Sequence, residues 1–313
     1  PTAIHVSARE EIERRLLPAL TNLRDALAER AGAFDGIVKI GRTHLQDAVP
    51  IRLGQEFAGY ASQIDHALRR LGVASEALAE LPIGGTALGT GINTHVEFPA
   101  RMAEALSGET GLAFRPASSF FEAMAGRDAV VEASAMLRTT AVSLSNIANN
   151  LRLLGSGPRC GIGEIKIPEL QPGSSIMPGK VNPVIPEAVM MVAAQVVGND
   201  ATIAWANALG SNFDLNVMMP VMAYNLLESI DLMTAAAEHL VAKCIDARDF
   251  LAGQNAHGTT RLEAAEARCR EHVERSLAMC TALAPRIGYD NAAALAKTAY
   301  REGTTIRELA HSL

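Results

Sequence analysis

Residues 188–197 read Ala-Val-Met-Met-Val-Ala-Ala-Gln-Val-Val, a stretch that would be apolar on nearly every side of a helix. Pro183 and Pro186 precede it, and proline is well tolerated in the first turn of a helix. We therefore expect a helix from about residue 183 to about residue 207. A helix without a polar face is stable when neighbours cover it all round. This stretch therefore predicts a helix buried among others, either by association of several bundles or as the central helix of a monomer.

Four further stretches have the periodicity of long helices, over about 8–31, 53–80, 126–154 and 213–246. The apolar stripe of the first is Ile12, Leu16, Leu20, Leu23 and Leu27. The stripe of the third is Val130, Ala133, Leu137, Val142, Leu144, Ile147 and Leu151. Helices of this length exceed the mean of about 11–12 residues in globular proteins. The fold class that we predict is all-α, an elongated bundle of about five long helices.

Composition agrees with this prediction and excludes some functions. Hydrophobic residues make up 49% of the 313 residues but aromatic residues only 4%, which favours packed helices over a β-sandwich. The net charge of −6 argues against a general surface for nucleic acid or anionic membranes. No uninterrupted apolar run reaches the ~18 residues of a membrane span. We expect neither a nucleic-acid nor a membrane partner.

The cysteines give no sign of a metal site. Cys160, Cys244, Cys269 and Cys280 form no Cys-x-x-Cys pair and have no histidine at the spacing of a zinc site. Their even count leaves disulfides open. The chain also lacks a glycine-rich nucleotide loop. We expect no metal and no cofactor.

Residues 173–183 read Gly-Ser-Ser-Ile-Met-Pro-Gly-Lys-Val-Asn-Pro and carry most of the functional information. Glycine and proline prevent regular structure here and expose backbone N–H groups. Lys180 and Asn182 add a positive charge and a neutral donor, which suits an anionic ligand. Gly-Ser-Ser alone is most often an ordinary turn, whereas the whole string is far more specific. We refer to residues 173–182 as the signature loop.

This string resembles the signature of the fumarase/aspartase superfamily, tetrameric lyases that add or remove water, ammonia or an amine across the double bond of a dicarboxylate. The resemblance covers nearly the whole chain. Further matching blocks are Lys39-Ile40-Gly41-Arg42-Thr43-His44-Leu45-Gln46-Asp47-Ala48 and the residues at 84–87, 89–95, 156–164 and 212–217.

The resemblance implies an organisation for the chain. Residues 1–250 would form the central helical-bundle lyase domain, and 251–313 a small helical C-terminal domain that is incomplete. The family's N-terminal domain would be absent, because the chain opens on what resembles the tail of the first signature block. The bundle would form the core of a homotetramer with active sites shared between subunits. We expect a cytoplasmic protein, with a mitochondrial location left open because a targeting signal would precede this chain.

The resemblance also implies roles for individual residues. Ser174 would be the catalytic base, His44 the second proton-transfer group, and Glu187 the carboxylate that orients His44. A glutamate at the start of a helix is also a routine favourable charge. The residues expected to bind a C4 dicarboxylate such as fumarate or L-malate are Thr43, Ser175, Lys180, Val181 and Asn182.

Other polar residues receive no catalytic role. His95, in Asn93-Thr94-His95, is interpreted as a structural or supporting residue. Arg159 and Glu164 are expected to shape their loop without touching substrate. We place the remaining histidines at the surface or at helix ends: His66, His239, His257, His272 and His311.

Within the superfamily, Arg159-Cys160-Gly161-Ile162-Gly163-Glu164 and Asn212-Phe213 favour a class II fumarase, which hydrates fumarate to L-malate reversibly. Asn216-Val217-Met218-Met219-Pro220 looks partly like an aspartase. Aspartate ammonia-lyase therefore stays the alternative. A catalytically silent structural relative is a third hypothesis, although a scaffold has no physical need for the set of polar residues above.

Overall fold

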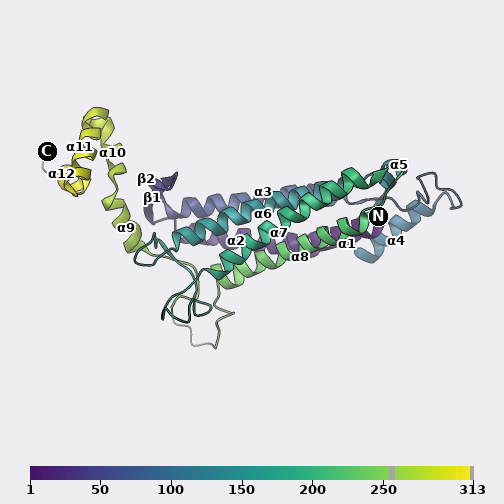
Figure 1. Cartoon of the computed structure of the whole chain (residues 1–313), viewed down its shortest axis with the longest axis horizontal. Helices are drawn as coiled ribbons and strands as arrows, with labels where there is room; N and C mark the ends of the chain where they lie inside the picture. The colour runs from purple at the N-terminus through teal and green to yellow at the C-terminus, as the bar shows by residue number, and fades with distance from the viewer. Residues whose placement is uncertain (254–257, 311–313) are drawn as a thin grey trace. The chain divides into compact units, whose positions relative to one another are not determined.

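The computed structural model of the chain describes residues 1–253 and 258–310 (Figure 1), and it is predominantly helical, as the sequence predicts. Five helical runs dominate, at 2–33, 53–77, 128–154, 184–210 and 219–245. Among the described residues, strands form only four two-stranded sheets.

The chain divides into two compact units, each built from separate segments. The first comprises residues 1–24, 62–150 and 183–244, and the second comprises residues 25–61, 151–182 and 245–313. Helices α2, α3 and α6 each contribute residues to both units. The division into domains 1–250 and 251–313 stays a prediction.

The first unit contains the long helices. Its elements are α1 (Thr2–Glu11), a π-helical turn (Ile12–Leu16), the start of α2 (Leu17–Ala33), most of α3 (Leu53–Ala77), β3 (Glu80–Leu81), α4 (Phe98–Thr110), β4 (Arg115–Pro116), α5 (Phe120–Ala125), α6 (Asp128–Leu154), α7 (Val184–Gly210), β6 (Ser211–Asn212), β7 (Leu215–Asn216) and α8 (Met219–Leu240), after which a second π-helical turn covers Val241–Ile245. Strands β3 and β4 pair in parallel, and β6 and β7 pair antiparallel.

The apolar stripes predicted from periodicity lie in the core, with one exception. The five residues of the first stripe are fully buried, and so is most of the α6 stripe. The prediction that Val142 belongs to the buried stripe is wrong, because Val142 is 57% exposed. It follows Ala141, which is buried in its place, so the buried face of α6 is shifted by one residue at this point.

Helix α7 buries one face only in the single chain. Val189, Ala193 and Val196 are buried, whereas Met191 is 70% exposed and Trp205 is 65% exposed. The expectation that the 188–197 stretch is covered on every side is thus not met within one chain. By length and composition α7 could cross a membrane, but a core helix of a soluble protein passes the same criterion.

Two polar residues in the middle of α7 are buried and satisfied. Asp200 accepts hydrogen bonds at 2.8 Å from Ser134 Oγ and from Arg138, both on α6. The Asn199 side chain donates to Glu228 and Ser229 of α8 at 2.9 and 3.0 Å. Buried polar groups need such partners, and these hydrogen bonds fix how α7 packs against α6 and α8.

The last long helix begins later than its periodicity suggests. The sequence predicts helix from about 213, but β6 and β7 form a tight antiparallel hairpin there, and α8 begins only at Met219. Asn216 is fully buried and accounts for this difference. Its side chain donates to Ser211 Oγ at 3.0 Å and accepts from the Met218 N–H at 2.8 Å, so local side-chain bonds replace the first helical turn.

The helices that lie wholly in the second unit are short. This unit contains β1 (Val38–Thr43), β2 (Gln46–Arg52), β5 (Ile165–Lys166), β8 (Glu263–Ala264), α9 (Glu266–Arg275), a 3-10 turn (Leu277–Met279), α10 (Cys280–Ile287), α11 (Tyr289–Glu302) and α12 (Ile306–Ala310). Strands β1 and β2 form an antiparallel hairpin, and β5 pairs antiparallel with β8. A small apolar cluster around Cys280, Leu295 and Ile306 holds the last helices together.

Candidate functional site

The predicted residues Thr43 and His44 lie at the apex of the β1–β2 hairpin. Thr43 pairs with Gln46, so His44 and Leu45 alone form the turn. Both have positive φ, +54° and +59°, the conformation that a two-residue type I′ turn requires and that Asn-Gly usually supplies. For residues with a Cβ this conformation costs roughly 1–2 kcal/mol each. The apex is therefore strained, and Thr43, His44 and Leu45 are all exposed.

The inner part of β1 is irregular. The pairing register shifts between Ile40 and Arg42, which places a bulge at Gly41. A Cβ on Gly41 would lie 2.9 Å from the Val49 carbonyl oxygen, so this close approach of the strands requires glycine. Lys39, Ile40 and Gly41 are all buried. The bulge re-aims the side chains next to the apex.

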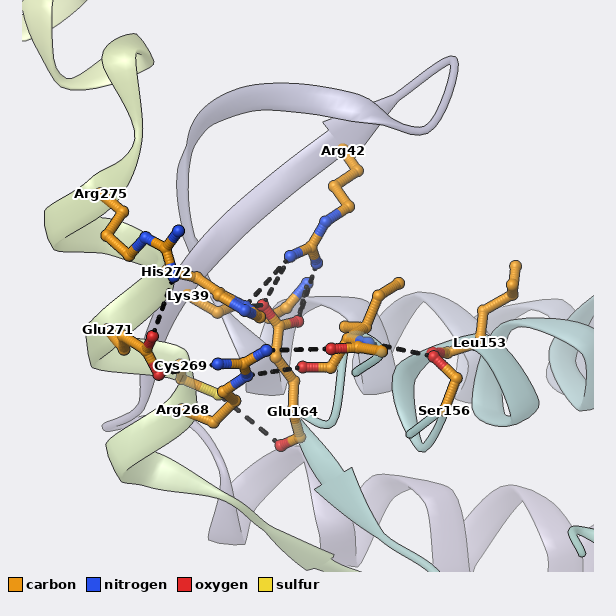
Figure 2. Close-up of polar contacts among 12 residues, drawn as sticks. Lys39, Arg42, Leu153, Ser156, Glu164, Arg268, Cys269, Glu271, His272 and Arg275 are labelled. Atoms are coloured by element: carbon orange, nitrogen blue, oxygen red, sulfur yellow. Dashed lines mark hydrogen bonds and ion pairs between the residues drawn. The ribbon is translucent and has the colours of Figure 1, made fainter. Parts of the chain in front are cut away.

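Glu164 is the centre of a buried ion cluster, which consists of Lys39, Arg42, Glu56, Glu164 and His272. Figure 2 labels all of these except Glu56. The Glu164 carboxylate is fully buried and accepts two parallel hydrogen bonds from the Arg42 guanidinium, both at 2.9 Å. His272 Nδ1 donates to it at 2.8 Å, and the Lys39 ammonium lies 3.2 Å away.

The charges of this cluster determine the ionisation of Glu164. Burial by itself opposes the charged carboxylate, but the hydrogen bonds from Arg42 and His272 and the charges of Lys39 and Arg42 outweigh it, so the pKa of Glu164 lies below its ordinary value. Lys39 also forms an ion pair with Glu56 at 2.9 Å. Two carboxylates, Glu56 and Glu164, thus face the basic side chains of Lys39 and Arg42, and a buried cluster requires such opposite partners.

Helix α9 fixes the segment that carries Glu164. The Arg268 guanidinium donates to the carbonyl oxygens of Gly161 and Ile162 at 3.0 and 3.2 Å. The Ala265 N–H donates to the Glu164 carbonyl at 2.8 Å. The prediction that Glu164 shapes its loop is consistent with these contacts. Of the two predicted alternatives for His272, surface or helix end, the structure agrees with the second: the residue lies in the last turn of α9, and its ring is 17% exposed and bonded to Glu164.

The signature loop is closed by its own backbone. The Gly173 N–H donates to the Lys180 carbonyl at 2.7 Å, and the Lys180 N–H donates to the Met177 carbonyl at 3.2 Å. The Asn182 side chain donates to the Gly173 carbonyl at 3.1 Å. A Cβ on Gly173 would lie 2.6 Å from the Lys180 carbonyl oxygen, so this closure needs glycine.

Within the loop, Ser174 is held by two backbone donors. Its hydroxyl oxygen accepts hydrogen bonds from the N–H groups of Ile176 and Met177, both at 3.2 Å. Ser174 and Asn182 are half-buried, while Ser175, Lys180 and Val181 are exposed. Two amide donors on one hydroxyl oxygen would stabilise a negative charge there.

The structure brings only some of the predicted residues together. Ser174, Ser175, Lys180, Val181 and Asn182 share one loop, and Thr43 and His44 share one turn. Both groups belong to the second unit, but within residues 1–253 and 258–310 no hydrogen bond or ion pair joins them. Glu187 lies in the first turn of α7, in the first unit. Its pairing with His44 stays a prediction.

The remaining histidines have separate outcomes. His95 is exposed, and its Nδ1 accepts a hydrogen bond from the Glu97 N–H at 3.2 Å. His66 and His239 are exposed, as predicted. His257 and His311 lie outside the described residues.

Sequence reasoning missed Lys39, Arg42 and His272 as members of a buried cluster. Lys39 and Arg42 belong to the same matching block as Thr43 and His44, and Glu164 ends another matching block. Charged residues of opposite sign in two such blocks were the available signal that these side chains could pair. For His272 the sequence carries no comparable signal, because its neighbours Arg270, Glu271 and Arg275 are typical of a solvated face.

A cavity of about 420 Å³ lies elsewhere, in the first unit. Among its lining residues are His5, Glu80, Arg115 and Arg127, and none of the predicted site residues. Burial lowers the pKa of His5 to about 4, and its Nδ1 donates to the Glu80 carbonyl at 2.8 Å.

The four cysteines are free, with Cys160 exposed and the others buried. Among the described residues, no group of three or more histidine, cysteine, aspartate or glutamate side chains is placed to hold a metal ion.

Comparison with known proteins places the chain in a family. A family model described as a lyase matches residues 1–198. The chain belongs to the lyase family. A second model, described as the fumarase C C-terminus, matches residues 279–313 of the chain. The resemblance stated from the sequence is thereby confirmed.

Similar proteins come from bacteria and fungi. The chain is 53% identical over 313 residues to a class II fumarate hydratase of Neisseria meningitidis, covering 100% of this chain and 64% of that protein. It is 50% identical over 313 residues to a mitochondrial fumarate hydratase of Rhizopus oryzae, covering 100% of this chain and 60% of that protein. The chain thus spans less than two thirds of the length of these relatives.

Solved structures agree with this chain in fold. A class II fumarase from Schistosoma mansoni superposes with a TM-score of 0.91 at 36% identity, covering 100% of this chain and 65% of that chain. A fumarate lyase:delta crystallin from Brucella melitensis, bound to cobalt, superposes with a TM-score of 0.88 at 41% identity, covering 100% and 64%. The predicted helical-bundle fold is confirmed.

Proposed function

We propose that the protein containing this chain catalyses the reversible hydration of fumarate to L-malate. The observation that carries the proposal is the hydroxyl of Ser174, which accepts two backbone N–H groups in a loop that also presents Lys180 and Asn182. The identity of about half of all residues to proteins named fumarate hydratase supports this substrate. A serine in an ordinary turn would need neither the lysine nor the amide.

In the direction from malate, Ser174 as an alkoxide would take a proton from the carbon next to one carboxylate. The electrons of that C–H bond pass into the carboxylate and give an aci-carboxylate with two negative charges. The amides of Ile176 and Met177 would lower the cost of the serine alkoxide. Binding the aci-carboxylate more strongly than the substrate would lower the barrier. In this scheme Lys180 supplies the positive charge, and Asn182 and Ser175 supply neutral donors.

The second step breaks the carbon–oxygen bond. The electron pair of the aci-carboxylate forms the carbon–carbon double bond, and the hydroxyl leaves as water after receiving a proton from His44, directly or through a water molecule. Histidine suits this transfer near neutral pH. Glu187 would orient His44 and raise its basicity. Thr43 and Val181 would contact the substrate.

Asn182 is already partly engaged. One N–H of its side chain donates to the Gly173 carbonyl, which leaves its second N–H and its oxygen for a ligand. It would therefore serve both to close the loop and to bind the substrate.

We also propose that the protein is a homotetramer whose active sites combine residues of several subunits. The support is the apolar face of α7 and α8 that the single chain leaves uncovered, which includes Met191, Trp205, Leu209, Val221 and Tyr224. Contiguous exposed apolar surface on a soluble protein usually marks an interface. Light scattering after size exclusion would test it: a monomeric mass for the complete protein would reject the tetramer. For its location we retain the cytoplasm, with mitochondria as the alternative.

The test of function follows the ultraviolet absorbance of fumarate with the complete protein, offered L-malate and L-aspartate in parallel without added metal. Fumarate from malate alone is expected. Fumarate from aspartate alone would reject hydration in favour of an ammonia-lyase with the same base. Activity with neither, together with no thermal stabilisation by a tartrate or citrate analogue, would favour a silent structural relative.

A further inference from the structure

The residues at the apex of the β1–β2 hairpin have few contacts that could fix their position. Residues 43–47 are all exposed, and the backbone of the turn residues His44 and Leu45 is in an unfavourable conformation. Strained residues persist only where the surrounding structure imposes the conformation. The anchor must lie below the apex.

Arg42 is the first residue below the apex whose side chain is directed inward. Its side chain is 17% exposed, and both ends of the guanidinium fork bond to the two oxygens of Glu164 (Figure 2). A bidentate pair fixes the plane and the direction of the guanidinium, which a single hydrogen bond does not. Three positions earlier, Lys39 reaches the same carboxylate. One carboxylate therefore holds β1 at two points.

Glu164 is itself fixed by the protein around it. Its backbone N–H donates to the Leu154 carbonyl at 2.8 Å, and its carbonyl accepts from Ala265 at 2.8 Å. The following residue, Ile165, pairs with Ala264 in the β5–β8 sheet. On the other side of the carboxylate, His272 of α9 donates at 2.8 Å. Glu164 is thus a rigid point from which the hairpin is held.

We propose that Glu164 is a positioning residue that fixes His44 at the hairpin apex through the Arg42 guanidinium. The inference rests on the proposed function, because the proposed function gives His44 a proton to transfer. Glu164 is fully buried and cannot touch a substrate, so it acts only through the residues that it holds.

The test is Glu164→Gln in the complete protein, made alone and combined with His44→Asn. Glutamine has the shape of glutamate but carries no charge, and only one of its two terminal atoms accepts hydrogen bonds. It therefore cannot accept both N–H groups of the Arg42 guanidinium. We expect kcat to fall about 10- to 100-fold, the range that a small misplacement of a catalytic group produces. In the His44→Asn background the same substitution should change kcat by less than about twofold, because the group that Glu164 positions is already missing.

The matched control is Glu274→Gln, the same change on α9, the helix that carries His272. Glu274 pairs with Arg307 at 2.7 Å on the surface, and among the described residues it forms no hydrogen bond or ion pair with the hairpin, so kcat should stay unchanged. If Glu164→Gln does not fold, Arg42→Lys replaces it in the cycle, since lysine keeps the charge beside Glu164 but loses the fork. An equal loss of kcat with and without His44, or no loss in either background, would overturn the proposal.

A second readout does not depend on turnover. Amide hydrogen exchange of residues 43–47 should become at least about tenfold faster in Glu164→Gln, while α8 exchanges as in the wild type. If the wild type does not convert malate or fumarate, the proposed function fails, and exchange alone still decides whether Glu164 holds the apex. Unchanged exchange at residues 43–47 would overturn the proposal that Glu164 holds the apex.

Discussion

The hairpin apex and the signature loop hold their polar residues in opposite ways. The apex, with Thr43 and His44, depends on a buried ion cluster whose members come from distant parts of the chain. The signature loop depends on bonds between its own residues 173–182. The first arrangement makes the position of His44 sensitive to changes far away. The second makes Ser174 sensitive mainly to changes inside the loop.

The largest effect is expected from Ser174→Ala. Removal of the hydroxyl removes the group that would take the substrate proton, so kcat for malate should fall by about 10²–10⁴-fold or more. The loop should stay closed, because Gly173, Lys180 and Asn182 make the closing bonds. A steady-state assay of the complete protein, with circular dichroism as the check on folding, measures this. A kcat within a few-fold of the wild type would reject Ser174 as the base.

Gly173→Ala tests whether the loop holds Ser174 locally. The added Cβ would lie 2.6 Å from the Lys180 carbonyl oxygen, so the closing hydrogen bond must lengthen or break, which should shift Ser174 relative to Lys180 and Asn182. We expect kcat to fall about 10- to 100-fold with little change in Tm, because the loop is largely exposed.

Gly108→Ala on α4 serves as the control for that experiment, since a Cβ there meets nothing within 4 Å and the residue is not on the α7 and α8 face proposed as the interface. It should leave kcat unchanged. Equal kcat values for Gly173→Ala and the wild type would show that the loop tolerates opening.

The pH dependence of stability distinguishes the hairpin anchor from the loop. The folded protein lowers the pKa of Glu164 below its ordinary value of 4.5, so the stabilisation is complete above that value and is lost as the pH falls through the lower, folded pKa. The gap in unfolding free energy between wild type and Glu164→Gln should be constant above about pH 5.5 and narrow below about 4.5. Urea titrations over this range measure it. A gap that widens on acidification would contradict the sign of the shift.

The smallest effect is expected from Leu45→Gly at the apex. Glycine adopts the positive φ of this turn without the Cβ clash, and Leu45 is 72% exposed, so few contacts are lost. Stability should rise by up to about 1 kcal/mol. Thermal or urea unfolding measures it, with exchange at residues 43–47 unchanged because the Arg42–Glu164 pair persists. A loss of stability would mean that Leu45 packs against another surface in the assembled protein.

Local patterns in the sequence predicted the helices well and the irregular regions poorly. The spacing of Leu16, Leu20, Leu23 and Leu27 identified a buried stripe because one face of a helix repeats every three to four residues. The same reasoning extended the last helix back to about 213, where the hydrogen bonds of Asn216 form a hairpin instead. It also left the β1–β2 hairpin without a prediction, because His-Leu is not a usual turn sequence.

The sequence alone determined the helical class, the family, and which residues stand in the signature loop, because these depend on neighbours along the chain. Only the tertiary structure decided what holds the hairpin apex. Glu164 lies 122 positions from Arg42 and 108 positions from His272, and no local pattern links residues so far apart. Their pairing is decided by burial, since a charged group removed from water must find opposite charges wherever the fold brings them.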